Sequence, residues 1–368
     1  MSSDEVKSYA ESGVDVVGLE GGLGKLVARL AETNSFPRRG KPALPNGFFA
    51  NVLDLGGGMG LAIGTDGVGT KILVAHALRR YDTVGIDLIA MNVNDVLCVG
   101  AEPIALVDYI AVPGTDAELL DQLSQGLVEG ARQARISIPG GEIAQVKDLL
   151  RPHEPDGRES FDVVATAVGV VSMDKLIVGR DVAPGDVVIG LAASGIHSNG
   201  LTLARKVLAN GHGAEAYSER PGVLGGRSVG EELLVPTRIY VREVMALLDA
   251  GLPVRALAHI TGDGLLNLLR IDAQDIGFEF DDLLEPPLLY ELIAERAKLD
   301  NAEMYATFNM GIGFCIVLPE DAADKALELV RAEGSVAKVI GRAVRDPSNS
   351  VKLPSVGIVG AGKSFYKA

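Results

Sequence analysis

The sequence contains no tryptophan and only two cysteines in 368 residues. Cys98 and Cys315 both lie among apolar residues, and they do not form the Cys-x-x-Cys pair that zinc sites and redox centres use. We therefore expect two buried free thiols and no structural zinc site. Because tryptophan is absent, any stacking on a nucleotide base must use Phe, Tyr or aliphatic side chains.

Positive charge is also scarce. The 34 Lys and Arg residues stand against 49 Asp and Glu residues, which gives a formal net charge of −15. Nucleic acids and anionic membrane surfaces are bound through basic patches, so we expect neither as a partner. A ligand that carries phosphate must then be held by local basic groups, backbone amides and metal ions.

Long hydrophobic runs are missing as well. No apolar run approaches the ~18 residues of a spanning helix, and no charged-then-apolar signal peptide opens the chain, so we expect a cytoplasmic protein. Two blocks of alternating strands and helices predict a two-domain chain of the α+β or α/β class. We place the first domain at residues 1–171, the second at 172–345 and a C-terminal extension, ordered only in part or by a partner, at 346–368.

The densest polar chemistry lies in a predicted helix over residues 83–99. At about 100° per residue, Asp87, Asn94 and Asp95 share one side of this helix, and the opposite side is apolar. The segment contains no Lys or Arg, so its carboxylates have no partner one turn away. Such a stripe is common on solvated surfaces. If the carboxylates converge on one place instead, an oxygen-only set suits Mg²⁺.

A glycine-rich stretch, GTDGVGTK at residues 64–71, precedes this helix and carries Asp66. Glycines let successive amides line a phosphate site, and Lys71 supplies a positive charge. The order Thr70-Lys71 reverses that of a Walker motif, which excludes a P-loop fold. A glycine-rich turn alone is usually only a turn, but next to an acidic helix it favours a metal–phosphate site.

Three later segments add candidates. Glu142 follows Gly140-Gly141 at a predicted strand end, where a carboxylate can bind metal or orient a nucleophile. A loop at 195–200 enters a predicted helix over 201–208, and a second glycine loop at 261–264 follows a predicted strand. Helix N-termini bind anions, although Ser198 or Asn199 can equally be a simple N-cap.

The order of these motifs, which extend over nearly the whole chain, resembles that of aminoimidazole ribonucleotide synthetase, a family also called phosphoribosylformylglycinamidine cyclo-ligase. The motifs are YAESGVDV at 9–16, GTDGVGTK at 64–71, DLIAMNVNDVLCVGAEP at 87–103, GGE at 140–142, SGIHSNG at 194–200, PTRIYV at 236–241, HITGDG at 259–264 and TFNMGIG at 307–313.

The resemblance implies ATP-dependent cyclisation of formylglycinamidine ribonucleotide to aminoimidazole ribonucleotide in purine biosynthesis, with ADP and phosphate released. It also implies Mg²⁺, a homodimer whose N-terminal strands pair into a β-barrel, a C-terminal α/β domain, and a nucleotide site between the two domains. ATP transfers phosphate to the formyl oxygen, and an amidine nitrogen then attacks the activated carbon. Such a transfer depends on positioning and charge neutralisation.

Matching the family's motifs residue by residue gives four sets of expected site residues. We expect catalytic roles for Asp66, Lys71, Glu142, His197 and His259. Because imidazole titrates near neutrality, the two histidines are the candidates for proton transfer. We expect ATP to contact Gly64, Thr65, Gly67, Gly69, Thr70, Lys71, Asn92 and Asp95. The substrate set is Ser198, Asn199, Thr261, Gly262 and Asn309, and the Mg²⁺ set is Asp66, Asp87 and Asp95.

The chain departs from the family's usual pattern at Ile143, Gln145 and Asp263. Gln145 cannot carry charge, and a carboxylate at Asp263 would repel a neighbouring phosphate unless its backbone turns it away. Asp enters the left-handed region more readily than most residues, so Asp263 can be tolerated there. Two alternatives therefore stay open: a sister phosphoryl-transfer enzyme of the kinase type, and a nucleotide-binding regulator without turnover.

Overall fold

The computed structural model describes residues 16–152, 157–209 and 213–368, and residues 9–15 of the first motif lie outside these ranges. Among the described residues, the strands form two mixed sheets of six and eight strands. The first sheet ends with Ser172 and the second begins with Val187. We call the parts of the chain built on these sheets the first and second units.

In the first unit, the strand order β1-β2-β3-β6-β4-β5 is antiparallel except for the parallel pair β4–β5. Every second residue of β6 from Val163 to Val171 is buried, as expected when helices cover one face of a sheet. The elements are α1 (Val16–Ala31), β1 (Lys41–Pro42), β2 (Asn51–Gly56), β3 (Met59–Gly67), α2 (Lys71–Leu78), α3 (Asp82–Leu97), β4 (Glu102–Val112), α4 (Ala117–Ala134), β5 (Ser137–Gln145) and β6 (Asp162–Ser172).

The second unit has the strand order β14-β13-β12-β9-β11-β7-β10-β8, and strand β10, between β7 and the edge strand β8, is buried along its whole length. Its elements are β7 (Val187–Ala192), α5 (Leu201–Leu208), α6 (Val229–Leu233), α7 (Val241–Asp249), β8 (Ala256–His259), β9 (Ile276–Phe280), α8 (Leu289–Ala297), α9 (Asn301–Thr307), β10 (Ile312–Leu318), α10 (Ala323–Ala332), β11 (Ala337–Arg345), β12 (Val351–Leu353), β13 (Ile358–Ala361) and β14 (Ser364–Lys367).

Two expectations for the second unit need correction. Its strands pair antiparallel except for β12 with β9, so the unit is α+β rather than α/β. The segment 346–368 is not a partly ordered extension, because it supplies β12, β13 and β14 to the sheet. Its apolar residues Val351, Leu353 and Phe365 are buried there. The predicted domain boundaries themselves stay predictions.

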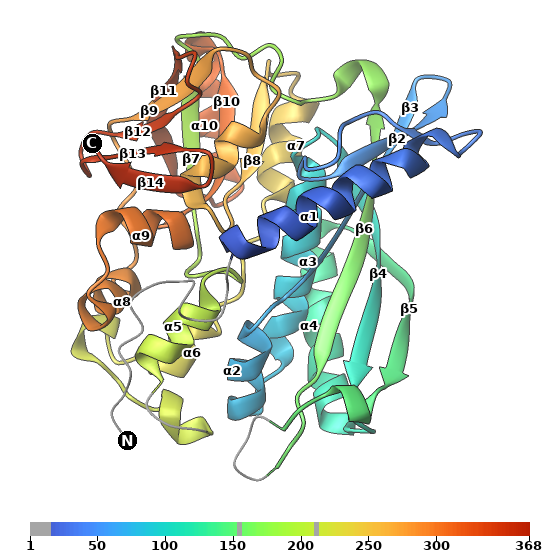
Figure 1. The fold of residues 1–368 in the computed structure, drawn as a ribbon, viewed down its shortest axis with the longest axis vertical. Coiled ribbons are helices and arrows are strands. Elements are labelled where there is room, and N and C mark those ends of the chain that lie inside the picture. The colour runs from blue at the N-terminus through green and yellow to red at the C-terminus, as the bar shows by residue number, and fades with distance from the viewer. Residues whose placement is uncertain (1–15, 153–156, 210–212) are drawn as a thin grey trace.

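Helix α3 occupies the centre of the molecule. It packs on β3 and β6 of the first sheet, on α4 beside it, and on α7 and β8 of the second unit. Figure 1 shows α2, α3 and α4 between the long strands β4, β5 and β6 and the helices of the second unit. Since other elements surround α3 on several sides, most of its polar residues are buried with its apolar ones.

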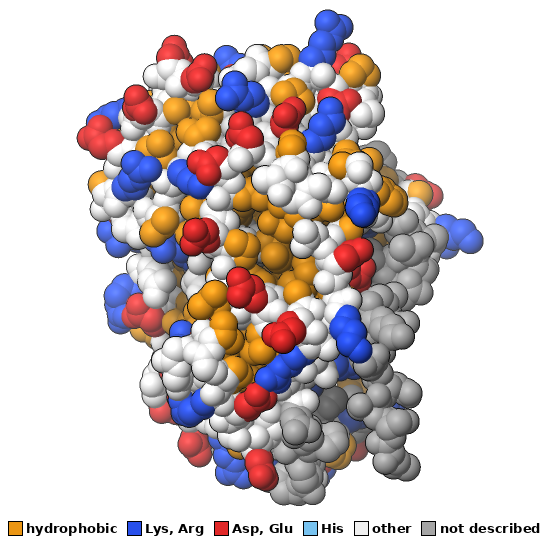
Figure 2. All heavy atoms as spheres, turned by 90° about the vertical axis from the view of Figure 1, so that its left-hand side faces the viewer, with side chains coloured by type: hydrophobic (Ala, Val, Ile, Leu, Met, Phe, Trp, Pro, Cys, Tyr) orange, Lys and Arg blue, Asp and Glu red, His pale blue; other side chains and the backbone are white. Residues whose placement is uncertain are grey.

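The surface and the thiols agree with the composition. Cys98 and Cys315 are buried and free, as expected. Figure 2 shows one face of the molecule with hydrophobic side chains near its middle and both acidic and basic side chains around them, so the negative net charge is not gathered into one patch there. Among the described helices, none has the length and apolar character needed to cross a membrane.

Glycines allow α3 and α4 to approach closely. A Cβ atom on Gly85 would meet the backbone nitrogen of Leu127, and one on Gly126 would meet the carbonyl oxygen of Asp82. We expect Gly85→Ala to lower the free energy of unfolding by about 1–3 kcal/mol, because the backbones must separate. Thermal unfolding measures this, with Gly114→Ala, which meets nothing within 4 Å, as the control. Equal melting temperatures for the two variants would contradict the tight helix contact.

Candidate functional site

The predicted polar stripe of α3 exists, and it faces the second unit rather than solvent. Asn94 donates from Nδ2 to the carbonyl of Arg238 at 2.9 Å, and its Oδ1 accepts from the backbone N–H of Tyr240 at 3.0 Å. Asp87 and Asp95 likewise contact the second unit, at Thr237 and His259 respectively. The stripe therefore lies at the boundary between the two units.

Asp87 is used by the protein itself. Its Oδ1 lies 2.8 Å from Nζ of Lys71, and both side chains are fully buried. The same oxygen accepts from N and Oγ1 of Thr237 at 2.7 and 2.6 Å. Burial lowers the pKa of Lys71, and the neighbouring Asp87 partly offsets that effect.

The expected roles of Asp87 as a ligand of Mg²⁺ and of Lys71 at the ATP phosphates stay predictions. In the structure Lys71 is paired with Oδ1 of Asp87, and the buried Oδ2 of Asp87 has no hydrogen-bond partner among the described residues. The carboxylates of α3 were expected to lack a basic partner because α3 itself has no Lys or Arg one helical turn away. The partner of Asp87 is Lys71, which lies 16 residues earlier in the sequence. It reaches α3 only because α2 and α3 pack together.

The remaining acids, Asp66 and Asp95, form the centre of the candidate site. Asp66 lies near the end of β3. Burial, followed by the charge of Asp95, raises the pKa of Asp66 to about 6. Asp95 is 20% exposed, and its Oδ1 lies 2.9 Å from Nδ1 of the fully buried His259. Two neighbouring carboxylates that repel one another provide a place where positive charge is favoured.

Asn92 supports this centre without facing it. Its Oδ1 accepts from the backbone N–H of Asp66 at 3.0 Å, and its Nδ2 donates to the carbonyl of Asp66 at 3.1 Å and to that of Leu88 at 2.9 Å. Both ends of the amide are thereby occupied. Asn92 consequently orients Asp66, and its expected contact with ATP stays a prediction.

The pair Asp66 and Asp95 fits Mg²⁺ by its chemistry. Both residues offer carboxylate oxygens, the donors that this ion prefers. Within the described part of the chain, no group of three or more His, Cys, Asp or Glu residues could hold a metal ion. The protein would thus supply only part of the coordination shell, as is usual when waters and substrate phosphates complete it.

The expected ATP residues divide into two groups. Gly64 and Thr65 lie inside β3, and the hydroxyl of Thr65 donates to the carbonyl of Ala165 at 2.6 Å, so these two residues belong to the sheet. Gly69 and Thr70 form the start of α2 and lie against the second unit. The Oγ1 atoms of Thr70 and Thr202 are 2.9 Å apart, and the carbonyl of Ser198 lies close to Gly69.

Gly67 already donates its N–H to Oδ1 of Asp66 at 2.7 Å. The glycine-rich stretch at 67–70 therefore faces the loop at 194–200 across the boundary between the units.

His197 is turned into the protein. It has a φ of 62°, its ring is 1% exposed, and its Nε2 accepts from the backbone N–H of Ser194 at 3.2 Å. Burial, with the nearby charges of His259, Lys71 and Arg238, holds the pKa of His197 well below its ordinary value. The Nδ1 atom of the ring is buried and has no hydrogen-bond partner among the described residues. The expected catalytic role of His197 stays a prediction.

Of the other expected substrate residues, Asn199 and Gly262 lie opposite each other, and Asn309 supports one of the two loops. Asn199 approaches Gly262, so the loops at 194–200 and 261–264 lie together. Asp263 has a φ of 70°, the left-handed conformation in which this departure from the family's pattern was expected to be tolerated. The amide of Asn309 donates to the carbonyls of Gly195 and Ile196 and accepts from Tyr290 and Gly311, so Asn309 supports the loop at 194–200. Its expected contact with substrate stays a prediction.

Glu142 lies far from Asp66 within one chain. It is exposed in the middle of β5, not at a strand end, because the Gly-Gly pair continues the ladder with β4. Glu142 is on the same rung of the sheet as Gly67, three strands away. At about 4.8 Å per strand this is about 14 Å. The departures at Ile143 and Gln145 are on the same edge strand.

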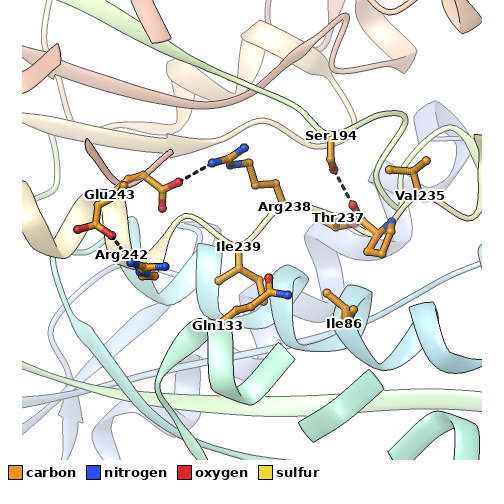
Figure 3. A pocket seen from close by; sticks show the side chains of 11 residues that line it. Ile86, Gln133, Ser194, Val235, Thr237, Arg238, Ile239, Arg242 and Glu243 are labelled. Atoms are coloured by element: carbon orange, nitrogen blue, oxygen red, sulfur yellow. Dashed lines mark hydrogen bonds and ion pairs between the residues drawn. The ribbon is translucent and has the colours of Figure 1, made fainter. Parts of the chain in front are cut away.

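A pocket of about 380 Å³ lies beside the segment 235–239. Figure 3 shows its charged side chains: Arg238 points to Glu243, with 2.9 Å between Nη2 and Oε1, and Arg242 is likewise paired, with Glu333. Because each guanidinium already has a carboxylate partner, the pocket offers no excess positive charge. Neither Asp66 nor Asp95 lines this pocket.

Sequence reasoning assigned no role to Thr237 or Asn94. Thr237 lies in the PTRIYV motif. The motif indicated that the segment matters in the family, but it did not predict that Thr237 contacts Asp87. Asn94 was already on the predicted stripe of α3. Both residues bond across the boundary between the units.

Comparisons with known proteins decide the family. Residues 49–171 match the family AIR synthase related protein, N-terminal domain, and residues 183–354 match AIR synthase related protein, C-terminal domain. The phosphoribosylformylglycinamidine cyclo-ligase of Methanothermobacter thermautotrophicus is 46% identical over 346 residues, which cover 94% of this chain and 96% of that protein. The chain belongs to the AIR synthase related family.

Further relatives agree with this membership and confirm the resemblance found in the motifs. The phosphoribosylformylglycinamidine cyclo-ligase of Thermococcus kodakarensis is 44% identical over 94% of this chain and 99% of its own length. A solved structure described as AaThiL complexed with AMPPCP and TMP superposes with a TM-score of 0.63 over 95% of this chain and 98% of that one. Its sequence identity of 17% supports a shared fold only. This AIR synthase related protein thus has the two-domain α+β architecture of its family.

The raised pKa of Asp66 makes a prediction for stability. Because the folded-state pKa of about 6 exceeds the ordinary 3.8, the charged carboxylate destabilises the ligand-free protein above pH 6 and has no such effect below pH 4. We expect Asp66→Asn to raise the free energy of unfolding by up to about 3 kcal/mol at pH 8. The gain should vanish toward pH 4.

Chemical denaturation at several pH values measures this gain, with the exposed Asp321→Asn as the control. A gain that is independent of pH would show that the carboxylate of Asp66 is not destabilised by its surroundings.

Proposed function

We propose that this AIR synthase related protein is a phosphoribosylformylglycinamidine cyclo-ligase. It uses ATP to close formylglycinamidine ribonucleotide into aminoimidazole ribonucleotide and releases ADP and phosphate. The observation that carries this proposal is the 46% identity to a cyclo-ligase over nearly the full length of both chains. The two facing loops and the carboxylate pair between the units agree with the requirements of the reaction.

The reaction must first convert a poor leaving group into a good one. The formyl oxygen attacks the γ-phosphorus of ATP, its bond to phosphorus forms, and the bond from that phosphorus to ADP breaks. The amidine nitrogen then attacks the activated carbon, loses a proton, and phosphate leaves with the former formyl oxygen. The first step brings the negatively charged ATP and ribonucleotide together, and the second expels phosphate, so positioning and charge neutralisation matter most.

The pair Asp66 and Asp95 is proposed to hold Mg²⁺, which neutralises phosphate charge when it is bound. The amides of Gly69 and Thr70, at the start of α2, are proposed to face the ATP phosphates. Ser198, Asn199, Thr261 and Gly262 are proposed to hold the ribonucleotide. Of the two histidines, His259 contacts a site carboxylate and His197 does not. We therefore assign proton exchange to the pair of His259 and Asp95.

The role of Asp66 can be separated from its effect on stability. We expect Asp66→Asn to lower turnover at least 100-fold, because an amide binds Mg²⁺ poorly, while the melting temperature stays equal or rises. The assay combines ATP, Mg²⁺ and formylglycinamidine ribonucleotide and measures the imidazole product. The variant Asp321→Asn should keep full activity. Near-normal turnover of Asp66→Asn would refute the proposed metal site.

The same assay on the unaltered protein tests the function itself. Product formation supports the cyclo-ligase. ADP formation only with another acceptor would indicate a sister phosphoryl-transfer enzyme, and nucleotide binding without ADP would indicate a regulator.

We also propose that two copies form a homodimer through the first sheet. Side chains on β4 expose apolar surface to solvent: Val107 and Tyr109, two residues apart and so on one face of the sheet, are 45% and 43% exposed. Adjacent exposed apolar side chains on a sheet mark a surface that another protein covers. A second copy would bury this surface and pair the strands of both copies into the barrel that the family resemblance implies.

Sedimentation velocity tests the homodimer. The unaltered protein should sediment as a dimer, and Val107→Asp with Tyr109→Asp should sediment as a monomer, because two buried carboxylates would have no partner. A pair of substitutions elsewhere, Asp321→Asn with Asp324→Asn, should leave the dimer intact. A monomeric unaltered protein at micromolar concentration would contradict the proposal.

A further inference from the structure

Lys71 joins three segments at one point. Its Nζ donates to Oδ1 of Asp87 at 2.8 Å, to the carbonyl of Val235 at 2.6 Å and to the carbonyl of His197 at 3.3 Å. The side chain is fully buried. An ammonium group has three protons, and here each has an acceptor. Lys71 therefore has no donor left for a ligand.

The contacts of Asp87 return to the same loop. Oγ1 of Thr237 donates to Oδ1 of Asp87 at 2.6 Å, and the Oγ atom of Ser198 lies 3.2 Å from the same Thr237 hydroxyl. We call Lys71, Asp87, Thr237 and Ser198 the Lys71 network. It begins in α2 and α3 of the first unit and ends in the loop at 194–200 of the second unit.

The loop needs such support because its backbone is strained. His197, which is not a glycine, has a φ of 62°, in the left-handed region that L-residues rarely adopt. The network holds the loop at this strained position and at the residue after it, through the carbonyl of His197 and the hydroxyl of Ser198. The adjacent residue, Asn199, faces Gly262 on the second loop of the site.

From these contacts we infer that Lys71 and Thr237 are positioning residues for the reaction. They fix the loop at 194–200 to the first unit, so that Ser198 and Asn199 stand opposite the glycine-rich stretch at 67–70. This inference rests on the proposed function, in which the loop binds the ribonucleotide and the stretch binds ATP. One buried ammonium group thereby joins the loop that is proposed to bind the ribonucleotide to the first unit.

Thr237 offers the cleanest test, because Lys71→Met would leave Asp87 charged and unpaired in the interior and could unfold the protein. Thr237→Val keeps the shape of the side chain and the backbone bond to Asp87 but removes the hydroxyl between Asp87 and Ser198. Thr237→Ser keeps that hydroxyl. The two variants therefore differ in the link that the inference requires.

We expect Thr237→Val to raise KM for the ribonucleotide about 10-fold, as expected for the loss of about one hydrogen bond, and to leave KM for ATP within about twofold. Thr237→Ser should restore the unaltered values. Unchanged KM values in Thr237→Val would overturn the inference, as would an equal loss in both variants or a parallel loss for both substrates.

Hydrogen exchange separates this inference from the proposed function. The amides of residues 196–200 should exchange about 10-fold faster in Thr237→Val than in the unaltered protein, and Thr237→Ser should match the unaltered protein. This readout needs no turnover. An unaltered protein that is inactive but shows this exchange pattern would refute the function and keep the anchoring of the loop. An active protein whose loop exchanges equally in all three forms would refute the anchoring.

Discussion

The ion pair of Lys71 and Asp87, buried between the two units, is the interaction on which the rest of the structure depends. A buried charge pair is tolerated only when further hydrogen bonds satisfy each ion. Lys71 finds them at two backbone carbonyls of the second unit, and Oδ1 of Asp87 finds them at Thr237, whereas the buried Oδ2 of Asp87 has no hydrogen-bond partner among the described residues. The bonds that do form exist only while the two units are together, so they make the contact between the units specific.

This arrangement divides the polar stripe of α3 between structure and chemistry. Asp87 and Asn94 are occupied by the second unit, while Asp95 lies in the last turn of the helix beside Asp66 and stays partly exposed. The C-terminal end of a helix carries partial negative charge, which disfavours another carboxylate. Asp95 therefore stands where a cation is most needed. One helix both joins the units and presents the acid that the proposed reaction uses.

The sequence predicted which side of a helix a side chain occupies better than it predicted which residues that side chain contacts. Periodicity correctly put Asp87, Asn94 and Asp95 on one side of α3, because that depends only on local helix geometry. It could not tell that Lys71 lies opposite Asp87, since tertiary packing brings the two helices together. The Gly-Gly pair before Glu142 was expected at the end of a strand, yet pairing with β4 continues the strand through and beyond it. His197 belongs to a motif that indicates a ligand site, but its ring packs inward. The motifs identified the family, and the fold decided which residues face the site.

The most direct test of this account is a crystal structure of the protein with Mg²⁺ and a non-hydrolysable ATP analogue. We predict a magnesium ion at about 2.1 Å from carboxylate oxygens of Asp66 and Asp95, with Nζ of Lys71 still bonded to Asp87. A metal ion on Asp87, or Lys71 moved to the phosphates, would contradict the division between the structural ion pair and the carboxylate pair of the site.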